Sequence, residues 1–222
     1  MSTDLLVPSG KPPLHIALLP DGARRWAVKK GCSVETSYSY SAVRLANTVQ
    51  ELLGPHCNEI TVLLSNWRNH LRSSADLVAF EDGIREFIAI AKEKCEREWR
   101  CSIHFLCPKE LRDDFCILST VQFPNNPRRL NICVAYDPLT ELWDSIQKSG
   151  SSRGDIFENL KINRPVDLAI RTGGSPLFSG FIPLQLAYAR LYLVEELFND
   201  VDSSQFAAAV GEFCNLPLVY GT

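Results

Sequence analysis

Residues 14–26 read Leu-His-Ile-Ala-Leu-Leu-Pro-Asp-Gly-Ala-Arg-Arg-Trp, and this stretch decides the fold class. Its first half, Leu14–Pro20, is short and almost continuously apolar, which is typical of a strand buried on both faces of a sheet. Gly22 allows the backbone to approach a ligand closely, and the residues after it are expected to open a helix whose free N–H groups favour an anion. A buried strand that leads into a helix is characteristic of parallel sheets.

The rest of the chain repeats this alternation. Similar apolar runs predict strands at 60–65, 102–107, 130–136, 166–172 and 189–196. Helical spacing of apolar residues predicts helices at 33–53, 73–98, 109–121, 137–149 and 203–213. The stretch 148–165 contains SGSSRG and is expected to be a flexible surface connection.

This alternation predicts an α/β fold with a central, mostly parallel sheet flanked by helices. The length of 222 residues suits one domain with a sizeable core. We assign this domain to residues 14–222 and expect residues 1–13, which contain Pro and Gly, to form a flexible N-terminal arm.

The composition argues against several classes of protein. The formal net charge is -3 and the pI is about 5.8, so no global positive field attracts nucleic acid. No apolar segment reaches the roughly 18 residues that span a bilayer, and the N-terminus lacks a targeting pattern. The 8 cysteines contain no C-x-x-C pair and are expected to be reduced thiols. We therefore expect a cytoplasmic protein without a membrane span.

Three loops that follow predicted strands carry arginine. Asp21, Gly22, Arg24 and Arg25 follow the first strand, Ser65–Ser74 follows the second, and Arg171-Thr-Gly-Gly-Ser follows the strand at 166–172. The carboxyl ends of parallel strands meet at one edge of the sheet, so these loops are expected to meet there. Guanidinium groups suit phosphate oxygens, and a carboxylate suits Mg²⁺. The three loops together predict a diphosphate–Mg²⁺ site, although each alone also fits a solvated turn.

Two longer motifs carry a family resemblance. HIALLPDGARRWAVKKG, from His15, is similar to the signature H-I-A-x-I-x-D-G-N-x-R-W-A of cis-prenyltransferases, the undecaprenyl diphosphate synthase family. DLAIRTGG, from Asp167, with Ser179-Gly-Phe and Gln185-Leu-Ala-Tyr, resembles the second signature of that family. The order and spacing of both motifs match over about residues 14–200, and the resemblance implies a fold of this family, with Mg²⁺ as cofactor and a homodimer as the assembly.

The resemblance implies a role for each matching position. Asp21 would bind Mg²⁺ and assist departure of the allylic diphosphate, whose site would be lined by Gly22, Ala23, Arg24 and Arg25. In the loop after the second strand, Asn69 and Arg72 match the asparagine and arginine of the family's S-x-E-N-W-x-R motif, and His70 replaces its tryptophan. Arg171 and Ser179 would hold the second diphosphate.

One member of this set, His70, has two interpretations. Taken alone, it fits a surface or capping histidine better than a catalytic one. In the context of the family it is a candidate proton acceptor for the terminating deprotonation.

Several positions depart from the family pattern. Ala23 replaces its asparagine, and residues 33–40 lack its R-x-x-G-H element. In the second signature, Ser175 and Leu177 replace a glutamate and an arginine, and Arg190 stands in place of the Mg²⁺-binding glutamate. A guanidinium does not bind Mg²⁺, so Arg190 is expected to contact diphosphate directly. A D-G-x-R-R-W turn without the G-H element resembles a small bacterial branch that makes irregular, lavandulyl-type or cyclic products.

These features support three hypotheses. The first is Mg²⁺-dependent condensation of a C5–C10 allylic diphosphate with a second isoprenoid unit into a short, irregular prenyl diphosphate. The second is a single-substrate terpene synthase, since the acceptor side is altered at Leu177 and Arg190. The third is a non-catalytic partner subunit, which the intact D-G turn at Asp21-Gly22 makes less favourable.

Overall fold

The fold is built on one six-stranded sheet. The computed structural model describes residues 13–71, 74–115, 121–149 and 153–215. The strands are β1 (Leu14–Leu19), β2 (Cys57–Leu63), β3 (Ser102–Leu106), β4 (Arg129–Cys133), β5 (Leu168–Arg171) and β6 (Arg190–Leu193). Their order is β3-β4-β2-β1-β5-β6, and each pairing between neighbours is parallel. The predicted α/β class with a parallel sheet is confirmed.

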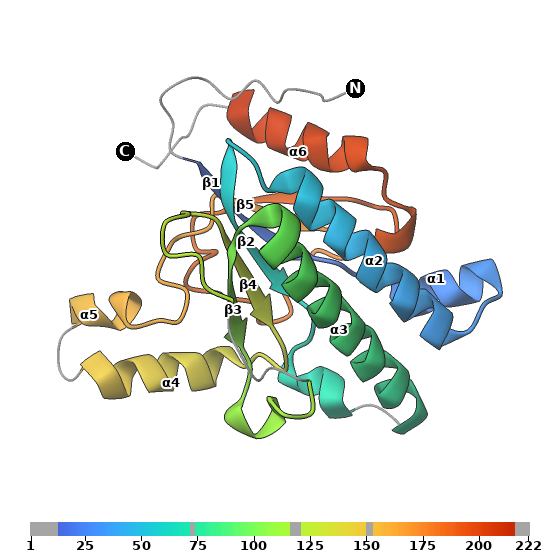
Figure 1. Cartoon of the computed structure of the whole chain (residues 1–222), viewed down its shortest axis with the longest axis horizontal. Helices are drawn as coiled ribbons and strands as arrows, with labels where there is room; N and C mark the ends of the chain where they lie inside the picture. Colours follow the sequence, from blue (N-terminus) through green and yellow to red (C-terminus); the bar gives the residue numbers. More distant parts are fainter. Residues whose placement is uncertain (1–12, 72–73, 116–120, 150–152, 216–222) are drawn as a thin grey trace.

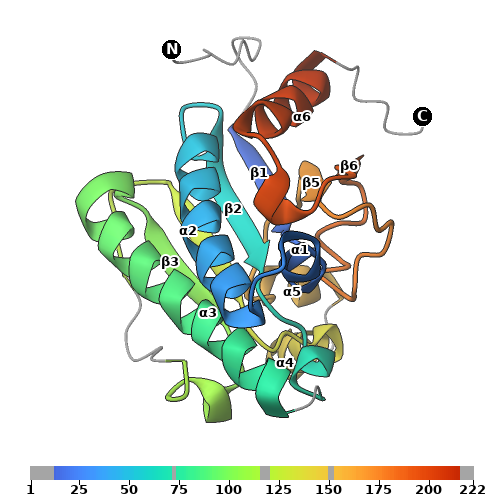
Figure 2. The same cartoon turned by 90° about the vertical axis from the view of Figure 1, so that its right-hand side faces the viewer.

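Helices cover the sheet. They are α1 (Ala23–Lys30), α2 (Val34–Leu52), α3 (Ser74–Lys94), α4 (Pro138–Ser149), α5 (Arg153–Glu158) and α6 (Ser203–Asn215). In Figure 1, α2 and α3 lie side by side across the sheet with α6 above them, while α4 and α5 lie at the lower left. Figure 2 shows α2 and α3 in front of β2 and β3.

The sheet has a core on each face, which explains why its strands are apolar throughout. Along β1, Ile16 and Leu18 pack with the buried side chains of α2, α3 and α6. The alternate residues Ala17 and Leu19 pack on the opposite face, where the segments 160–166 and 181–186 cover them. Successive strand side chains point to opposite faces, so a strand covered on both sides is apolar at nearly every position.

Two predicted segments differ in the structure. The helix expected at 109–121 is wrong in its described part: only a 3₁₀ turn forms at Lys109–Leu111, and the chain then turns so that Phe115 packs into the core. Helix α5 forms inside the connection expected at 148–165, where Ser145 Oγ donates a hydrogen bond to the carbonyl of Ile156. The predicted arm at 1–13 lies, apart from residue 13, outside the described residues.

A buried polar group, His15, stands on β1 among apolar neighbours. Its Nδ1 lies 3.0 Å from the carbonyl of Pro165, and its Nε2 lies 2.7 Å from Thr61 Oγ1. Asn131 Nδ2 donates to the same Thr61 oxygen at 2.9 Å, so the Thr61 hydroxyl proton is directed to His15. These partners select a neutral imidazole protonated on Nδ1. Burial lowers the pKa of His15, against the opposing effect of the Glu59 charge.

The first prediction concerns the pH dependence of stability. The unfolded chain takes up a proton on His15 near its ordinary pKa of about 6.5, before the folded protein does. The free energy of unfolding should therefore fall as the pH drops below that value, and His104, whose pKa burial also lowers, should act in the same direction. Urea unfolding at pH 7.5 and 5.5, about one pH unit on either side of the ordinary pKa, measures the free energy of unfolding. The difference between the two free energies should be smaller in His15→Gln. An unchanged difference in His15→Gln would show that His15 is not its source.

Candidate active site

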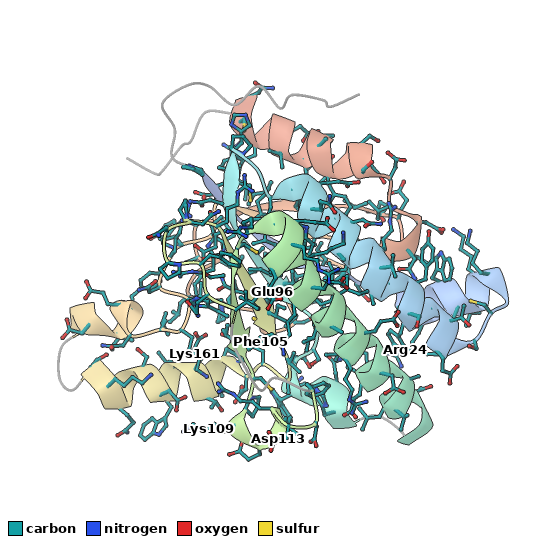
Figure 3. The ribbon with its side chains drawn as sticks, viewed as in Figure 1. Arg24, Glu96, Phe105, Lys109, Asp113 and Lys161 are labelled. Atoms are coloured by element: carbon teal, nitrogen blue, oxygen red, sulfur yellow. The ribbon has the colours of Figure 1, made fainter. Side chains whose placement is uncertain are left out.

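Three loops meet at the carboxyl ends of three neighbouring strands. The segment after β1 spans 20–22, the segment after β2 spans 64–69, and the segment after β5 begins at residue 172 and includes Ser179. They surround a cavity of about 520 Å³. Its lining includes Asp21, Gly22, Ala23, Arg24, Arg25, Asn66, Asn69, Arg171 and Ser179. Arg24 projects beside α1, α2 and α3 in Figure 3.

The Asp21 carboxylate is held between two guanidinium groups. Arg171 Nη2 donates to Asp21 Oδ2 at 3.0 Å, and Arg25 Nη2 lies 3.4 Å from the same oxygen. The backbone N–H of Asp21 donates to Thr172 Oγ1 at 2.9 Å, while the Asp21 carbonyl accepts from the N–H of Phe198 at 3.0 Å. The carboxylate is therefore fixed in position and already paired with positive charge.

Gly22 makes this turn possible. Its φ is 117°, in the left-handed region, and a Cβ there would lie 2.8 Å from Leu197 Cδ2. A side chain would be strained and would also collide with its neighbour. The glycine therefore lets α1 begin directly after Asp21, so that the N-terminus of this helix faces the cavity.

Arg171 is the buried cation of the site. Its side chain donates to Ser179 Oγ at 3.2 Å and to the carbonyl of Leu177. Its Nε is buried and has no hydrogen-bond partner within the described residues. A buried donor of this kind is normally satisfied by water or a ligand. Arg25 Nη1 donates to the carbonyl of Gly173 at 2.9 Å, which fixes the second guanidinium against the same loop.

Two amides form the third side of the cavity. The N–H of Asn66 donates to Asn69 Oδ1 at 2.9 Å, and the N–H of Asn69 donates to Asn66 Oδ1 at 3.1 Å. Asn66 Nδ2 also reaches the carbonyl of Ser179, at 3.3 Å, and so joins two loops. Sequence reasoning named Asn69 but missed Asn66. The available signal was that Asn66 follows the end of β2 by three residues, in the same loop as Asn69.

The structure does not bring all predicted site residues together. His70 does not line the cavity, because its ring nitrogens face Ser65 and Glu81. Arg190 pairs with Leu168 at the amino end of β6, and its guanidinium lies 5.8 Å from the Phe213 ring centre. Within this chain it is therefore away from Asp21 and its partners. Arg72 lies outside the described residues.

The cavity continues into an apolar pocket between α2 and α3. The pocket holds about 70 Å³ and shares five lining residues with the main cavity: Pro20, Ala23, Tyr38, Leu64 and Phe80. The rings of Tyr38 and Phe80 lie 5.3 Å apart where the two cavities join. Beyond them the lining includes Ala42, Leu45, Ile84 and Phe87. The arrangement offers a polar end for charged groups and a narrow apolar end.

Among the described residues that line the cavity, Asp21 is the one carboxylate that could bind a metal ion. No group of three or more His, Cys, Asp or Glu side chains gathers within the described residues. Mg²⁺ commonly binds through one or two carboxylates together with substrate phosphates and water. Asp21, beside donors that suit phosphate, fits that arrangement and does not fit a metal site made only of protein ligands.

Known proteins resemble this chain throughout. Residues 19–219 match the family model described as putative undecaprenyl diphosphate synthase. An isoprenyl transferase of Prochlorococcus marinus is 28% identical, over 90% of this chain and 80% of its own. The geranylgeranyl-diphosphate-specific tritrans,polycis-undecaprenyl-diphosphate synthase of Pyrococcus horikoshii is 27% identical, over 93% of this chain and 86% of its own.

Two solved structures share the fold. Lavandulyl diphosphate synthase from Lavandula x intermedia, in complex with dimethylallyl diphosphate, superposes with a TM-score of 0.80 at 17% identity, over 93% of this chain and 97% of its own. A probable undecaprenyl diphosphate synthase from Campylobacter jejuni has a TM-score of 0.71 at 18% identity, over 96% and 100%. The chain belongs to the undecaprenyl diphosphate synthase family and is a cis-prenyltransferase that condenses prenyl diphosphates.

Proposed function

We propose that this prenyltransferase joins a C5–C10 allylic diphosphate to a second isoprenoid diphosphate in a Mg²⁺-dependent reaction and releases a short, irregular prenyl diphosphate. The observation that carries the proposal is that the polar cavity, which arginine side chains line, opens into an apolar pocket of only about 70 Å³. The diphosphate has charged partners at one end, and the hydrocarbon chain has little room at the other.

The charged end suits loss of diphosphate. As the allylic C–O bond breaks, diphosphate leaves with the bonding electrons, and negative charge grows on its oxygens. Arg24, Arg25 and the N-terminus of α1 are placed to donate to these oxygens, and such preorganised donors supply a large share of catalysis. Bound Mg²⁺ would add Lewis-acid stabilisation of the same charge, with Asp21 as its protein ligand. The allylic cation then accepts the π electrons of the second unit, which afterwards loses a proton.

The irregular product is inferred from the acceptor side. Leu177, at the position of the family's arginine, is 66% exposed, and Arg190 lies at the far end of β6. A second diphosphate would thus have fewer cationic partners than in the family pattern. The similar fold of lavandulyl diphosphate synthase, whose structure holds dimethylallyl diphosphate, is consistent with a C5 allylic substrate. The same weakened acceptor side favours, as a second candidate, ionisation and cyclisation of one substrate alone.

Product analysis separates these functions. Purified protein is incubated with Mg²⁺ and dimethylallyl or geranyl diphosphate, with and without isopentenyl diphosphate. The extract is analysed by mass spectrometry before and after phosphatase treatment. The proposal predicts a product of two coupled units that is extractable only after phosphatase. A hydrocarbon or cyclic product from one substrate would establish the terpene synthase instead, and no product under any condition would favour the non-catalytic subunit.

We also propose a homodimer formed through the β6 edge of the sheet. Leu191 and Leu193 point from this edge strand with more than a third of their surface exposed, and Leu177, Leu184 and Tyr188 add exposed apolar area nearby in the chain. An unpaired strand edge with apolar side chains is a surface that proteins normally cover.

No helix within the described residues is long and apolar enough to cross a membrane.

The dimer gives a second prediction. The double change Leu191→Glu and Leu193→Glu should convert the protein to a monomer, because two carboxylates would be buried without partners. Light scattering coupled to size-exclusion chromatography measures the mass. Val78→Glu, an exposed apolar position on α3, is the matched control and should remain dimeric. A dimer that survives the double change would place the interface elsewhere.

A further inference from the structure

Ser65, His70 and Glu81 form a connected array beside the cavity. His70 Nε2 lies 3.1 Å from Ser65 Oγ, and His70 Nδ1 lies 3.4 Å from Glu81 Oε1. The other Glu81 oxygen pairs with Arg85 at 3.3 Å. The array joins three parts of the chain: the segment after β2 at Ser65, the 3₁₀ turn Trp67–Leu71, and helix α3 at Glu81.

The order serine–histidine–carboxylate resembles that of a hydrolase triad, but Ser65 is not placed as a nucleophile. Its side chain is 1% exposed, and its oxygen accepts the N–H of Ala135 at 2.7 Å. The Ser65 hydroxyl is thus occupied by the N–H of Ala135 and lies within hydrogen-bond distance of His70 Nε2, while His70 Nδ1 faces Glu81. The imidazole ring is further held between Phe80 and Phe115, with ring centres 6.2 and 6.0 Å away. Both ring nitrogens of His70 thus face side chains of the array.

The segment held by Ser65 is a strained turn after β4. Ala135 has a φ of 48°, in a region that residues other than glycine rarely adopt. Such a conformation persists only where its surroundings determine it. Besides the bond from Ala135, the N–H of Tyr136 donates to the Ser65 carbonyl at 3.0 Å, and the N–H of Trp67 donates to the Tyr136 carbonyl at 3.1 Å. The turn and the loop at 65–69 therefore form one unit.

The same loop carries the two amides that line the cavity. Asn66 and Asn69 each hold the other's backbone N–H, so their side chains keep their direction only while the loop keeps its shape. Ser65 is the residue before Asn66, and His70 is the residue after Asn69. The bond between Ser65 and His70 thus closes the loop across its base, and Glu81 anchors that closure to a long helix.

We propose that Glu81, His70 and Ser65 are positioning residues that fix Asn66 and Asn69 in the cavity, and that His70 is not the proton acceptor of the reaction. This inference rests on the proposed function, in which the cavity lined by these two amides holds the reacting substrates. It assigns a role to Ser65 and Glu81, and it accounts for a histidine that stands beside the cavity without lining it.

Amide substitutions at position 70 separate positioning from proton transfer. Glutamine places an amide near the Nε2 position and can bond Ser65, whereas asparagine places one near Nδ1 and can bond Glu81. Neither amide accepts a proton at neutral pH. We expect His70→Ala to lower kcat by at least about tenfold, since small misplacements of positioned groups are costly. His70→Gln should recover most of this loss and His70→Asn little of it. If Gln is as inactive as Ala while both remain folded, His70 acts as a base and the proposal fails.

A double-mutant cycle tests whether Ser65 is the partner of residue 70. In a Ser65→Ala background, His70→Gln should have no higher kcat than His70→Ala, because the glutamine amide no longer has the Ser65 hydroxyl to bond. Glu81→Gln should lower kcat, and Asp82→Asn is the matched control: it neighbours Glu81 and shares the ion pair with Arg85, but does not contact His70. If the substitutions at positions 65 and 70 changed kcat independently of each other, the proposed array would be wrong.

Hydrogen exchange tests the array without activity. The amides of Ala135, Asn66 and Asn69 should exchange faster in His70→Ala and return towards the wild-type rate in His70→Gln. Unchanged exchange in all variants would overturn the inference. If the wild-type protein made no product while these amides behaved as expected, the proposed function would fail and the loop-positioning role of the array would stand.

Discussion

Replacement of Asp21 by asparagine should lower the rate of product formation by about 10²–10³-fold, a loss of the size seen when an enzyme loses one preorganised hydrogen-bond donor. Asparagine keeps an oxygen that can accept from Arg171, so the turn after β1 should fold normally. It removes the negative charge that pairs with Arg171 and Arg25 and provides the carboxylate for Mg²⁺. The apparent Mg²⁺ concentration for half-maximal rate should rise as well.

Initial rates at several Mg²⁺ concentrations measure both effects. Asp200→Asn is the matched control, since Asp200 is a carboxylate packed beside α1 that does not line the cavity. Hydrogen bonds from Lys29, followed by those from Trp26 and Lys30, hold its pKa at about 2, so its loss should lower stability and leave the rate per folded molecule near that of the wild type. An Asp21→Asn protein that is folded and retains most of its activity would remove Asp21 from the mechanism.

The second large effect is on product length. The double change Tyr38→Ala and Phe80→Ala should give products at least one C5 unit longer when isopentenyl diphosphate is in excess. The two rings stand where the polar cavity meets the apolar pocket, and both line each of the two cavities. Removing them joins the cavities and exposes a passage lined by side chains such as Leu45 and Phe87, which suit a hydrocarbon chain.

Mass spectrometry after phosphatase treatment gives the product lengths. Tyr40→Ala is the matched control: Tyr40 also lies on α2, but its ring stacks on Trp26 at 5.2 Å and does not line either cavity. Removing two core rings should also lower stability, so the distribution of lengths rather than the yield is decisive. A folded, active double variant with unchanged product lengths would show that these rings do not limit the chain.

The polar end of the site could be predicted because its residues follow strands directly. In a parallel sheet the loops after neighbouring strands meet at one edge, so Asp21, Asn69 and Arg171 could be grouped from the sequence. Arg190 shows the limit of this reasoning. A motif gives the order of residues, but strand register decides which end of β6 a residue occupies, and Arg190 lies level with Leu168 at the amino end.

The apolar end could not be predicted for a different reason. Tyr38 and Phe80 belong to regular helical stripes, and a side chain that lines a pocket has the same spacing as one that fills a core. Only the packing of α2 against α3 distinguishes a pocket side chain from a core side chain. At Gly83 the two helices come so close that an added Cβ would lie 2.7 Å from Tyr38 Cβ. Asn66 was missed because its reciprocal bonds with Asn69 depend on loop geometry.

Incorporation of isotopically labelled isopentenyl diphosphate is the most direct test of the proposed condensation. The purified protein is given Mg²⁺, unlabelled dimethylallyl diphosphate and uniformly ¹³C-labelled isopentenyl diphosphate, with Asp21→Asn as the reference for background. Head-to-tail condensation predicts a dephosphorylated product that carries one intact labelled C5 unit for each coupling, with release of one inorganic diphosphate per coupling. The proposed irregular coupling of two dimethylallyl units predicts instead an unlabelled C10 product that retains one diphosphate, again with one diphosphate released. This is the result we expect, and a labelled product would show head-to-tail condensation. A product that has lost all its diphosphate, or no product above the Asp21→Asn background, would contradict the assignment of this cavity to prenyl transfer.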